Sequence, residues 1–177
     1  MSRTALLAVD VQGDFLPGGS LAVPDGDAVV APLLAAAERA GMVVATRDWH
    51  PAGHVSFAER GGPWPVHCVA GTAGGALHPD VDRVADLVVS KGTDTEVDAY
   101  SGFDRTPLAA VLRAAGITRV LVGSLATDYC VRATALDALR EGFEVVVLRD
   151  AVRAVDVQPG DGDRALEEMR AAGAQIR

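Results

Sequence analysis

Five short apolar runs, separated by amphipathic segments, constrain the fold of this chain more than any other feature. The runs lie at residues 5–11, 42–48, 86–92, 119–125 and 144–150. Each is apolar almost throughout rather than alternating, which is typical of strands buried on both faces of a parallel sheet. The segments between them, at 27–41, 107–116, 127–142 and 163–173, have helical spacing, and each ends at a glycine, a common helix terminator. This alternation predicts a three-layer α/β/α fold with a doubly wound, mostly parallel sheet.

Length and charge narrow the class of protein further. A chain of 177 residues fits one domain, which we expect to span 1–177. The net charge of -8 disfavours nucleic acid and anionic membrane surfaces as partners. No apolar stretch approaches the roughly 20 residues of a spanning helix, and Asp10 interrupts the apolar start, so we expect a cytoplasmic protein. Two cysteines, Cys68 and Cys130, are too few for a disulfide framework and are expected to be free thiols.

Two segments depart from the regular pattern. Residues 50–81 are rich in glycine and proline and have no strong period. A loop of that length in a compact domain is usually functional or forms a lid. Pro32 lies inside the first helical segment, so we expect that helix to start or bend there.

Polar side chains of complementary type lie at or just beyond the ends of four predicted strands. They are Asp10, Asp48, Lys91 and Cys130. Because sites in parallel α/β sheets form beyond the carboxyl ends of the strands, we expect these four residues to meet at one edge. One polar residue at a strand end is commonplace, whereas an acid pair, an amine and a thiol together favour a catalytic site.

Cys130 follows the fourth strand almost immediately. We expect Thr127 or Asp128 to cap the next helix, which places the thiol in the first helical turn. The helix dipole and a neighbouring Lys91 would then favour the thiolate. Backbone N–H groups there are candidate oxyanion donors, and Asp10 is a candidate proton acceptor. The alternative is that Cys130 is only a small buried apolar residue.

Three of the four histidines cluster after the second strand. His50, His54 and His67 lie within 20 residues of Asp48. Two imidazoles and a carboxylate suit Zn²⁺, Fe²⁺ or Mn²⁺, although isolated histidines are often structural. Cys68 is not at a helix start, and we interpret it as structural.

Four of the eight aromatic residues lie in loops that border the predicted site. They are Phe15, Trp49, Trp64 and Tyr100. Loop aromatics often close over a core, but here they are also candidates for a flat slot that holds a planar ring.

Six sequence blocks together resemble the nicotinamidase branch of the isochorismatase-like cysteine hydrolases. They are AVDVQGDFLPGGSLAV, TRDWHPAGHVSF, WPVHCVAGTAG, KGTDTEVDAYSGF, ATDYCVRATALDA and RAVDVQPGDGDRALEEMRAAGA, in order from Ala8 to Ala174. The resemblance implies hydrolysis of nicotinamide to nicotinate and ammonia in NAD salvage, through a cysteine thioester. It also implies activity on pyrazinamide.

The resemblance further implies a role for each site residue. The implied catalytic triad is Asp10, Lys91 and Cys130, and the implied oxyanion donors are the N–H groups of Ala126 and Cys130. The implied metal ligands are Asp48, His50 and His67, joined by a histidine near His54 in some members. The implied metal is one divalent ion. Zinc is the first candidate, and other members of the family bind iron or manganese. The implied substrate slot is Phe15, Trp64 and Tyr100, and the implied cis peptide is Leu125–Ala126.

Two positions depart from the family pattern, and several questions stay open. Gly13 replaces the usual asparagine and Ser124 the usual glycine, so substrate preference is less constrained than reaction type.

The alternatives are a related hydrolase of carbamoyl amides or isochorismate, a metal-water hydrolase in which Cys130 is inert, and a non-catalytic metal- or ligand-binding protein. The metal, the ranking of nicotinamide and pyrazinamide, and assembly into a homo-oligomer are not determined by the sequence.

Overall fold

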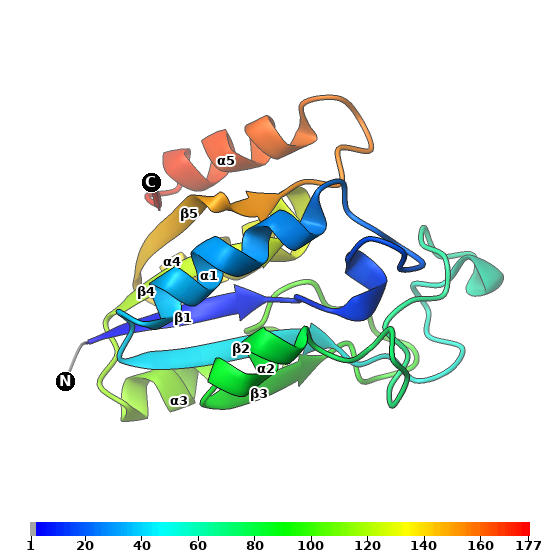
Figure 1. Ribbon diagram of the computed structural model, residues 1–177, viewed down its shortest axis with the longest axis horizontal. Coiled ribbons are helices and arrows are strands. Elements are labelled where there is room, and N and C mark those ends of the chain that lie inside the picture. The colour runs from blue at the N-terminus through cyan, green and yellow to red at the C-terminus, as the bar shows by residue number, and fades with distance from the viewer. Residues whose placement is uncertain (1–2) are drawn as a thin grey trace.

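A computed structural model describes residues 3–177, which form a six-stranded parallel sheet with strand order β3-β2-β1-β4-β5-β6 (Figure 1). The strands are β1 (Thr4–Val9), β2 (Met42–Asp48), β3 (Leu87–Lys91), β4 (Arg119–Leu125), β5 (Glu144–Arg153) and β6 (Gln175–Ile176). The chain builds outward from β1 to β3, returns to place β4 beside β1, and then builds outward in the other direction. The predicted doubly wound α/β fold is therefore confirmed.

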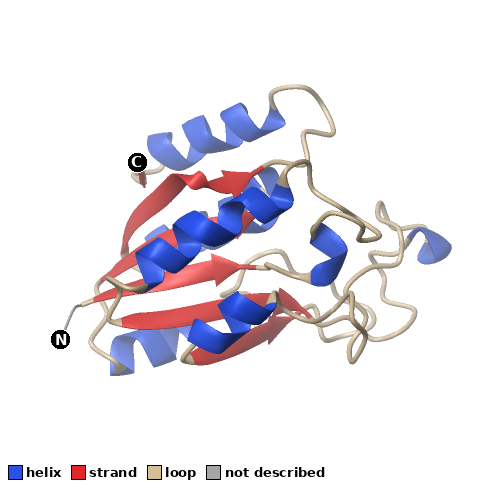
Figure 2. Cartoon of the chain, viewed as in Figure 1, coloured by secondary structure: helices blue, strands red, loops and turns tan. Residues whose placement is uncertain are grey.

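Helices cover both faces of the sheet (Figure 2). The helices are α1 (Val30–Ala37), α2 (Pro79–Val84), α3 (Leu108–Ala114), α4 (Arg132–Arg140) and α5 (Asp161–Ala171). Successive side chains of a strand point to opposite faces, so β1 contributes to two cores. Leu6 packs in the core that includes Leu33 of α1, whereas Leu7 packs in the core that includes Leu108 of α3. Burial on both sides explains why the strand sequences are continuously apolar.

The predicted strands agree with the observed ones to within three residues at every end, and two agree at both ends. Helix α1 begins at Val30, so Pro32 lies in its first turn, where proline is tolerated. Among the strands and α-helices of residues 3–177, two were not predicted, β6 and α2. Helix α2 has a local signal in its first turn, because Pro79 and Asp80 follow His78, whose ring accepts the N–H of Asp80.

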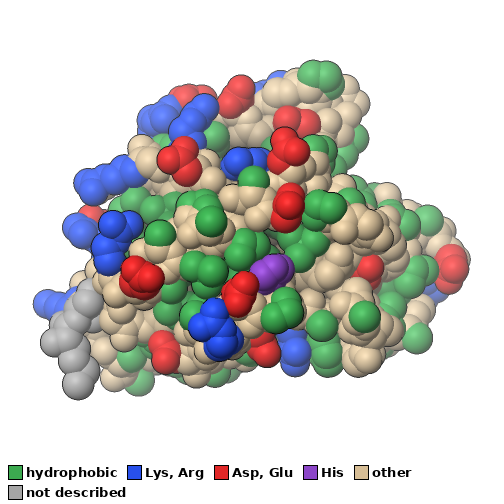
Figure 3. Space-filling view, viewed as in Figure 1, with side chains coloured by type: hydrophobic (Ala, Val, Ile, Leu, Met, Phe, Trp, Pro, Cys, Tyr) green, Lys and Arg blue, Asp and Glu red, His purple; other side chains and the backbone are tan. Residues whose placement is uncertain are grey.

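The carboxyl ends of β1 to β4 point toward the side of the molecule where the long loops gather (Figure 1). The direction of winding reverses between β1 and β4, which is where ligands bind in open α/β sheets. On the face shown in Figure 3, acidic and basic side chains are interspersed with apolar ones. Among residues 3–177, no helix is both long enough and apolar enough to cross a membrane.

Candidate active site

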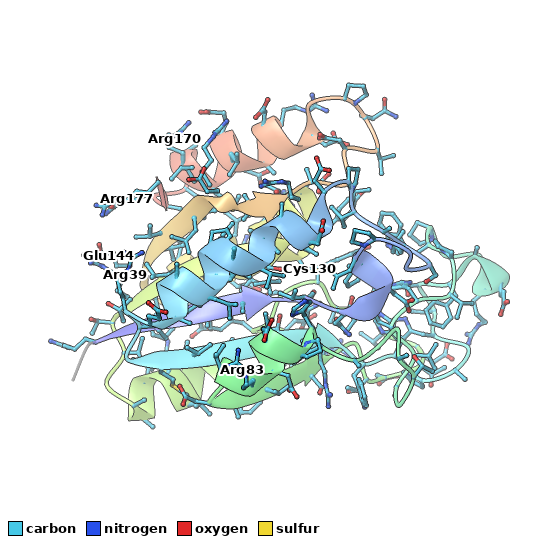
Figure 4. All side chains as sticks on the ribbon, in the orientation of Figure 1. Arg39, Arg83, Cys130, Glu144, Arg170 and Arg177 are labelled. Carbon is cyan, nitrogen blue, oxygen red and sulfur yellow. The ribbon has the colours of Figure 1, made fainter. Side chains whose placement is uncertain are left out.

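A buried amine lies at the centre of the site. Lys91 Nζ, at the end of β3, is 2.5 Å from Asp48 Oδ1, 2.9 Å from Asp10 Oδ2 and 3.4 Å from Cys130 Sγ. All four residues are at most 5% exposed. The four strand ends therefore converge, and Figure 4 shows Cys130 inside the molecule near the end of β1. Lys91 is also the single lysine of the chain, a signal that our sequence analysis did not use.

Asp10 occupies a strained and fully buried position directly after β1. Its φ of 53° lies in the left-handed region, and its N–H donates to Thr46 O at 3.1 Å. Oδ1 accepts a hydrogen bond from Thr46 Oγ1 at 2.7 Å, while Oδ2 forms an ion pair with Lys91 Nζ at 2.9 Å. Burial raises the pKa of Asp10, with help from Asp48 and against the effect of Lys91. A raised pKa makes this carboxylate a stronger proton acceptor than a surface aspartate.

Cys130 lies in a π-helical turn, Thr127–Val131, that leads into α4. Val131 N–H donates to Ala126 O at 3.1 Å, and the preceding Leu125–Ala126 peptide is cis, as the resemblance implied. The predicted cap by Thr127 or Asp128 is wrong, because the turn begins one residue earlier, after Ala126. The Asp128 carboxylate instead accepts N–H groups from the chain beyond β5.

The surroundings of the Cys130 thiol shift its pKa in opposite directions. Burial raises the pKa of Cys130 well above its usual range, Asp10 and Asp48 raise it further, and Lys91 only partly opposes them. Burial and the two carboxylates therefore act against the helix start and Lys91, which we expected from the sequence to favour the thiolate. The sulfur needs a nearby base, and a carboxylate oxygen of Asp10 lies within 4.8 Å of it.

Asp48, His50 and His67 bring three ligand atoms within 4.8 Å of one another. His50 Nδ1 lies 2.8 Å from Gly92 O, and His67 Nδ1 lies 2.8 Å from Pro65 O. Anchoring one imidazole nitrogen on a carbonyl leaves the other for a metal, the usual arrangement around metal-bound histidines. Lys91 Nζ pairs with both Asp10 and Asp48, and His50 Nε2 lies 3.7 Å from Asp48 Oδ2, so one carboxylate and two imidazoles lie beside each other, a donor set that suits a divalent cation. These residues fit a divalent metal ion.

His54 packs against the cluster formed by Asp48, His50 and His67. Its ring stacks on that of His50 with centroids 4.0 Å apart. Its Nδ1 lies 2.8 Å from Ser56 Oγ and its Nε2 lies 3.2 Å from Val97 O. Both ring nitrogens are therefore engaged by the protein, although His54 also forms a second grouping of potential ligands with His50 and Asp98.

An aromatic cleft opens beside the thiol. Its lining consists of Phe15, Leu21, Val23, Asp48, Trp64, His67, Tyr100, Ala126, Tyr129, Cys130 and Val155. Trp64 Nε1 donates to Tyr100 Oη at 3.0 Å, and the Trp64 ring meets Tyr129 edge-on with centroids 5.0 Å apart. Burial raises the pKa of Tyr100 to about 12, so its hydroxyl is neutral. The cleft thus has aromatic side walls and a thiol.

Trp49 does not take part in this cleft, contrary to our expectation. The Arg47 guanidinium lies over the Trp49 ring at 3.6 Å, and Trp49 does not line the cleft. Cys68 is fully buried, and burial raises the pKa of its thiol. Its N–H donates to Asp14 Oδ2 at 2.7 Å, so its backbone has a structural contact. Both cysteines are free thiols, as predicted.

Sequence reasoning missed Gln12, which fixes the backbone of Asp48. Its Nε2 donates to Asp48 O at 2.7 Å and to Gly75 O at 2.8 Å, while its Oε1 accepts from Asp48 N–H at 2.7 Å. The side chain is fully buried. A glutamine beside Asp10 in an otherwise apolar stretch was the available signal, because a buried amide needs several partners.

The two departures from the family pattern have different structural settings. A Cβ on Gly13 would lie 2.6 Å from Ala73 O, so this chain has no room for a side chain there without moving the 73–74 backbone. Ser124 is fully buried with a φ of 106°, and its hydroxyl has no hydrogen-bond partner within residues 3–177.

A doubly wound α/β fold that gathers a carboxylate, an amine and a thiol beside a cleft has the organisation of an enzyme with an activated nucleophile. The family model of the isochorismatase domain matches residues 4–177. The chain therefore belongs to the isochorismatase family.

Individual relatives are similar over nearly their whole length. The nicotinamidase of Escherichia coli (strain K12) is 41% identical, with 99% of this chain and 95% of the relative covered. The pyrazinamidase of Pyrococcus horikoshii, solved in complex with zinc, has 49% identity and a TM-score of 0.94, with 99% of each chain covered. PnC1 from L. infantum, solved in complex with nicotinate, has 39% identity and a TM-score of 0.94, with 100% and 94% covered.

Proposed function

We propose that this protein is a nicotinamidase, an amidohydrolase that converts nicotinamide to nicotinate and ammonia and also accepts pyrazinamide. The observation that carries the proposal is the contact of Lys91 Nζ with Asp10, Asp48 and Cys130 at the base of an aromatic cleft. The names of the relatives support it, because a nicotinamidase and a pyrazinamidase match nearly the whole chain.

In the proposed mechanism, the buried Asp10 carboxylate takes the proton of the Cys130 thiol. Its raised pKa suits this role, because a base works best when its pKa approaches the working pH. Lys91, which stays protonated since the two carboxylates hold its pKa well above the usual range despite burial, stabilises the sulfur anion as it forms. The sulfur then attacks the carboxamide carbon.

The second half of the reaction returns the proton. As the carbon–nitrogen bond breaks, protonated Asp10 gives its proton to the departing amino group, which leaves as ammonia. The acyl group stays on Cys130 as a thioester. Water attacks this thioester with Asp10 again as base, which releases nicotinate and restores the thiol. The N–H groups of Ala126 and Cys130 are the proposed donors to the oxyanion in both steps.

Asp48, His50 and His67 are the residues proposed to hold a divalent metal ion, with zinc first because a zinc complex of a relative is known. When bound, such an ion supplies a Lewis-acid contact for a ring nitrogen of the substrate. Phe15, Trp64 and Tyr100 are proposed to bind the ring by flat apolar contact, and they keep water away from the thiol.

The test is ammonia release from nicotinamide, pyrazinamide and a carbamoyl amide by the wild-type protein and by Cys130→Ala. We expect activity on the two ring amides in the wild type and a loss of at least about 10³-fold in the variant. An aldehyde analogue of nicotinamide should give a mass adduct on Cys130 that the variant lacks.

Other outcomes would favour the alternatives. Turnover that survives in Cys130→Ala would refute the covalent route and favour a metal-water hydrolase. Ammonia from the carbamoyl amide alone would reassign the substrate within the family. Binding of nicotinamide without any product would indicate a ligand-binding protein.

A further inference from the structure

The connection between β5 and α5 supplies one wall of the cleft. Val155 is the single lining residue, within the described chain, that comes from the sequence after Cys130. The connection, residues 154–160, has no regular secondary structure, and Asp156 within it has a left-handed φ of 52°. No helix or strand ladder fixes its position, and side-chain hydrogen bonds hold the part around Val155 and Asp156.

Asp128 provides those hydrogen bonds from the turn that carries the thiol. Its Oδ1 accepts the N–H of Val155 at 3.0 Å, and its Oδ2 accepts the N–H of Asp156 at 2.8 Å. Two consecutive amides are thus held by the two oxygens of one carboxylate. Hydrogen bonds to a charged acceptor are stronger than neutral ones, so this contact is a firm anchor.

The far side of the connection is also fixed. The Asp156 carboxylate accepts the N–H of Gly162 at 2.8 Å in the first turn of α5. A Cβ on Gly162 would lie 2.6 Å from Ala154 Cβ, so the helix start is in close contact with the connection. The connection is therefore held between Asp128 on one side and α5 on the other, with Val155 facing the cleft.

The thiol and this wall are mechanically linked, because Asp128 lies two residues before Cys130 in the same π-helical turn. The remaining lining residues of the described chain come from earlier in the sequence, between Phe15 and Tyr100. This set leaves out Val155 and the lining residues of the turn and its N-cap, which are Ala126, Tyr129 and Cys130. Val155 and that earlier group line the same cleft as Cys130, so the Val155 side chain is part of the wall that a ring beside the sulfur would meet.

We propose that Asp128 is a positioning residue and that Val155 is a specificity-determining residue, which together restrict the substrate to carboxamides of small, single, unsubstituted heteroaromatic rings. This inference rests on the proposed function, since it concerns the substrates of the same cleft. Asp128 has no contact with the reacting atoms and acts through the position of Val155.

The experiment compares ammonia release from nicotinamide and from quinoline-3-carboxamide, which carries a second fused ring. The variants are Val155→Ala, Asp128→Asn and the matched control Val157→Ala. Val157 belongs to the same connection but is 56% exposed and does not line the cleft. Far-ultraviolet circular dichroism establishes that each variant is folded.

In Val155→Ala, we expect kcat/KM for the quinoline amide relative to nicotinamide to rise at least tenfold, since small changes in an apolar pocket alter discrimination by about 10–200-fold. In Asp128→Asn, we expect the same direction of change, with KM for nicotinamide raised at least fivefold and kcat within twofold of wild type. Val157→Ala should leave the ratio within twofold of wild type.

An unchanged ratio in Val155→Ala would overturn the inference, even if Asp128→Asn fails to fold. A matching rise in Val157→Ala would also overturn it, because general loosening of the connection would then be the cause. If the wild type releases ammonia from neither amide, the proposed function itself fails, and the inference fails with it. A wild type active on nicotinamide, with an unchanged ratio in all variants, refutes the inference alone.

Discussion

The structure predicts most clearly how replacing Ser124 changes the free energy of unfolding. It lies where the ladder between β4 and β5 shifts register, with a φ of 106° in the region that favours glycine. Its side chain is fully buried, and Oγ has no hydrogen-bond partner within residues 3–177. We predict that Ser124→Gly increases the free energy of unfolding.

The magnitude follows from four contributions. Relief of the backbone strain is worth about 2 kcal/mol, and removal of a buried hydroxyl without a partner is worth about 2 kcal/mol. Against these, glycine costs about 1 kcal/mol through greater freedom of the unfolded chain, and the lost methylene costs about 1 kcal/mol of burial. The net gain is about 2 kcal/mol, or roughly 4–8 °C in Tm for a chain of this size.

The assay is urea denaturation of wild type, Ser124→Gly and the matched control Ser124→Ala. The alanine variant removes the hydroxyl but keeps the Cβ, so it should also gain about 2 kcal/mol, all of it from the hydroxyl. A Ser124→Gly midpoint at or below that of wild type would refute the reasoning. If Ser124→Ala alone matches wild type, the hydroxyl has a partner and only the strain contribution stands.

Two further changes test the supports of the site. Gln12→Glu replaces the two N–H donors to Asp48 O and Gly75 O with a buried carboxylate, so we predict a loss of about 2–4 kcal/mol in urea denaturation and weaker zinc binding by calorimetry. Tyr100→Phe tests the pH dependence of stability. Burial raises the pKa of Tyr100 from 10.0 to about 12. The contribution of Tyr100 to the free energy of unfolding is therefore complete below pH 10.0 and is lost as pH rises through about 12. The variant should lose less stability across that window, and equal losses in both proteins would contradict the assignment.

The sequence by itself determined the class of fold and the content of the site. Continuous apolar runs specify strands buried on both faces, so their ends were readable to within a few residues, and the polar residues at those ends were identified with them. The resemblance then added roles for Asp10, Lys91 and Cys130. These inferences depend on neighbours along the chain, which a sequence displays directly.

Only the tertiary structure decided which groups surround the thiol and shift its pKa, the support of Asp48 by Gln12, and the attachment of Val155 to Asp128. Each depends on groups far apart in sequence that the winding of the sheet brings together. Burial and charge at a point are sums over everything packed around it, and local spacing does not contain that sum. For this reason the helix-start argument for Cys130 left out burial and the two carboxylates, while the prediction that four strand ends meet at one edge held.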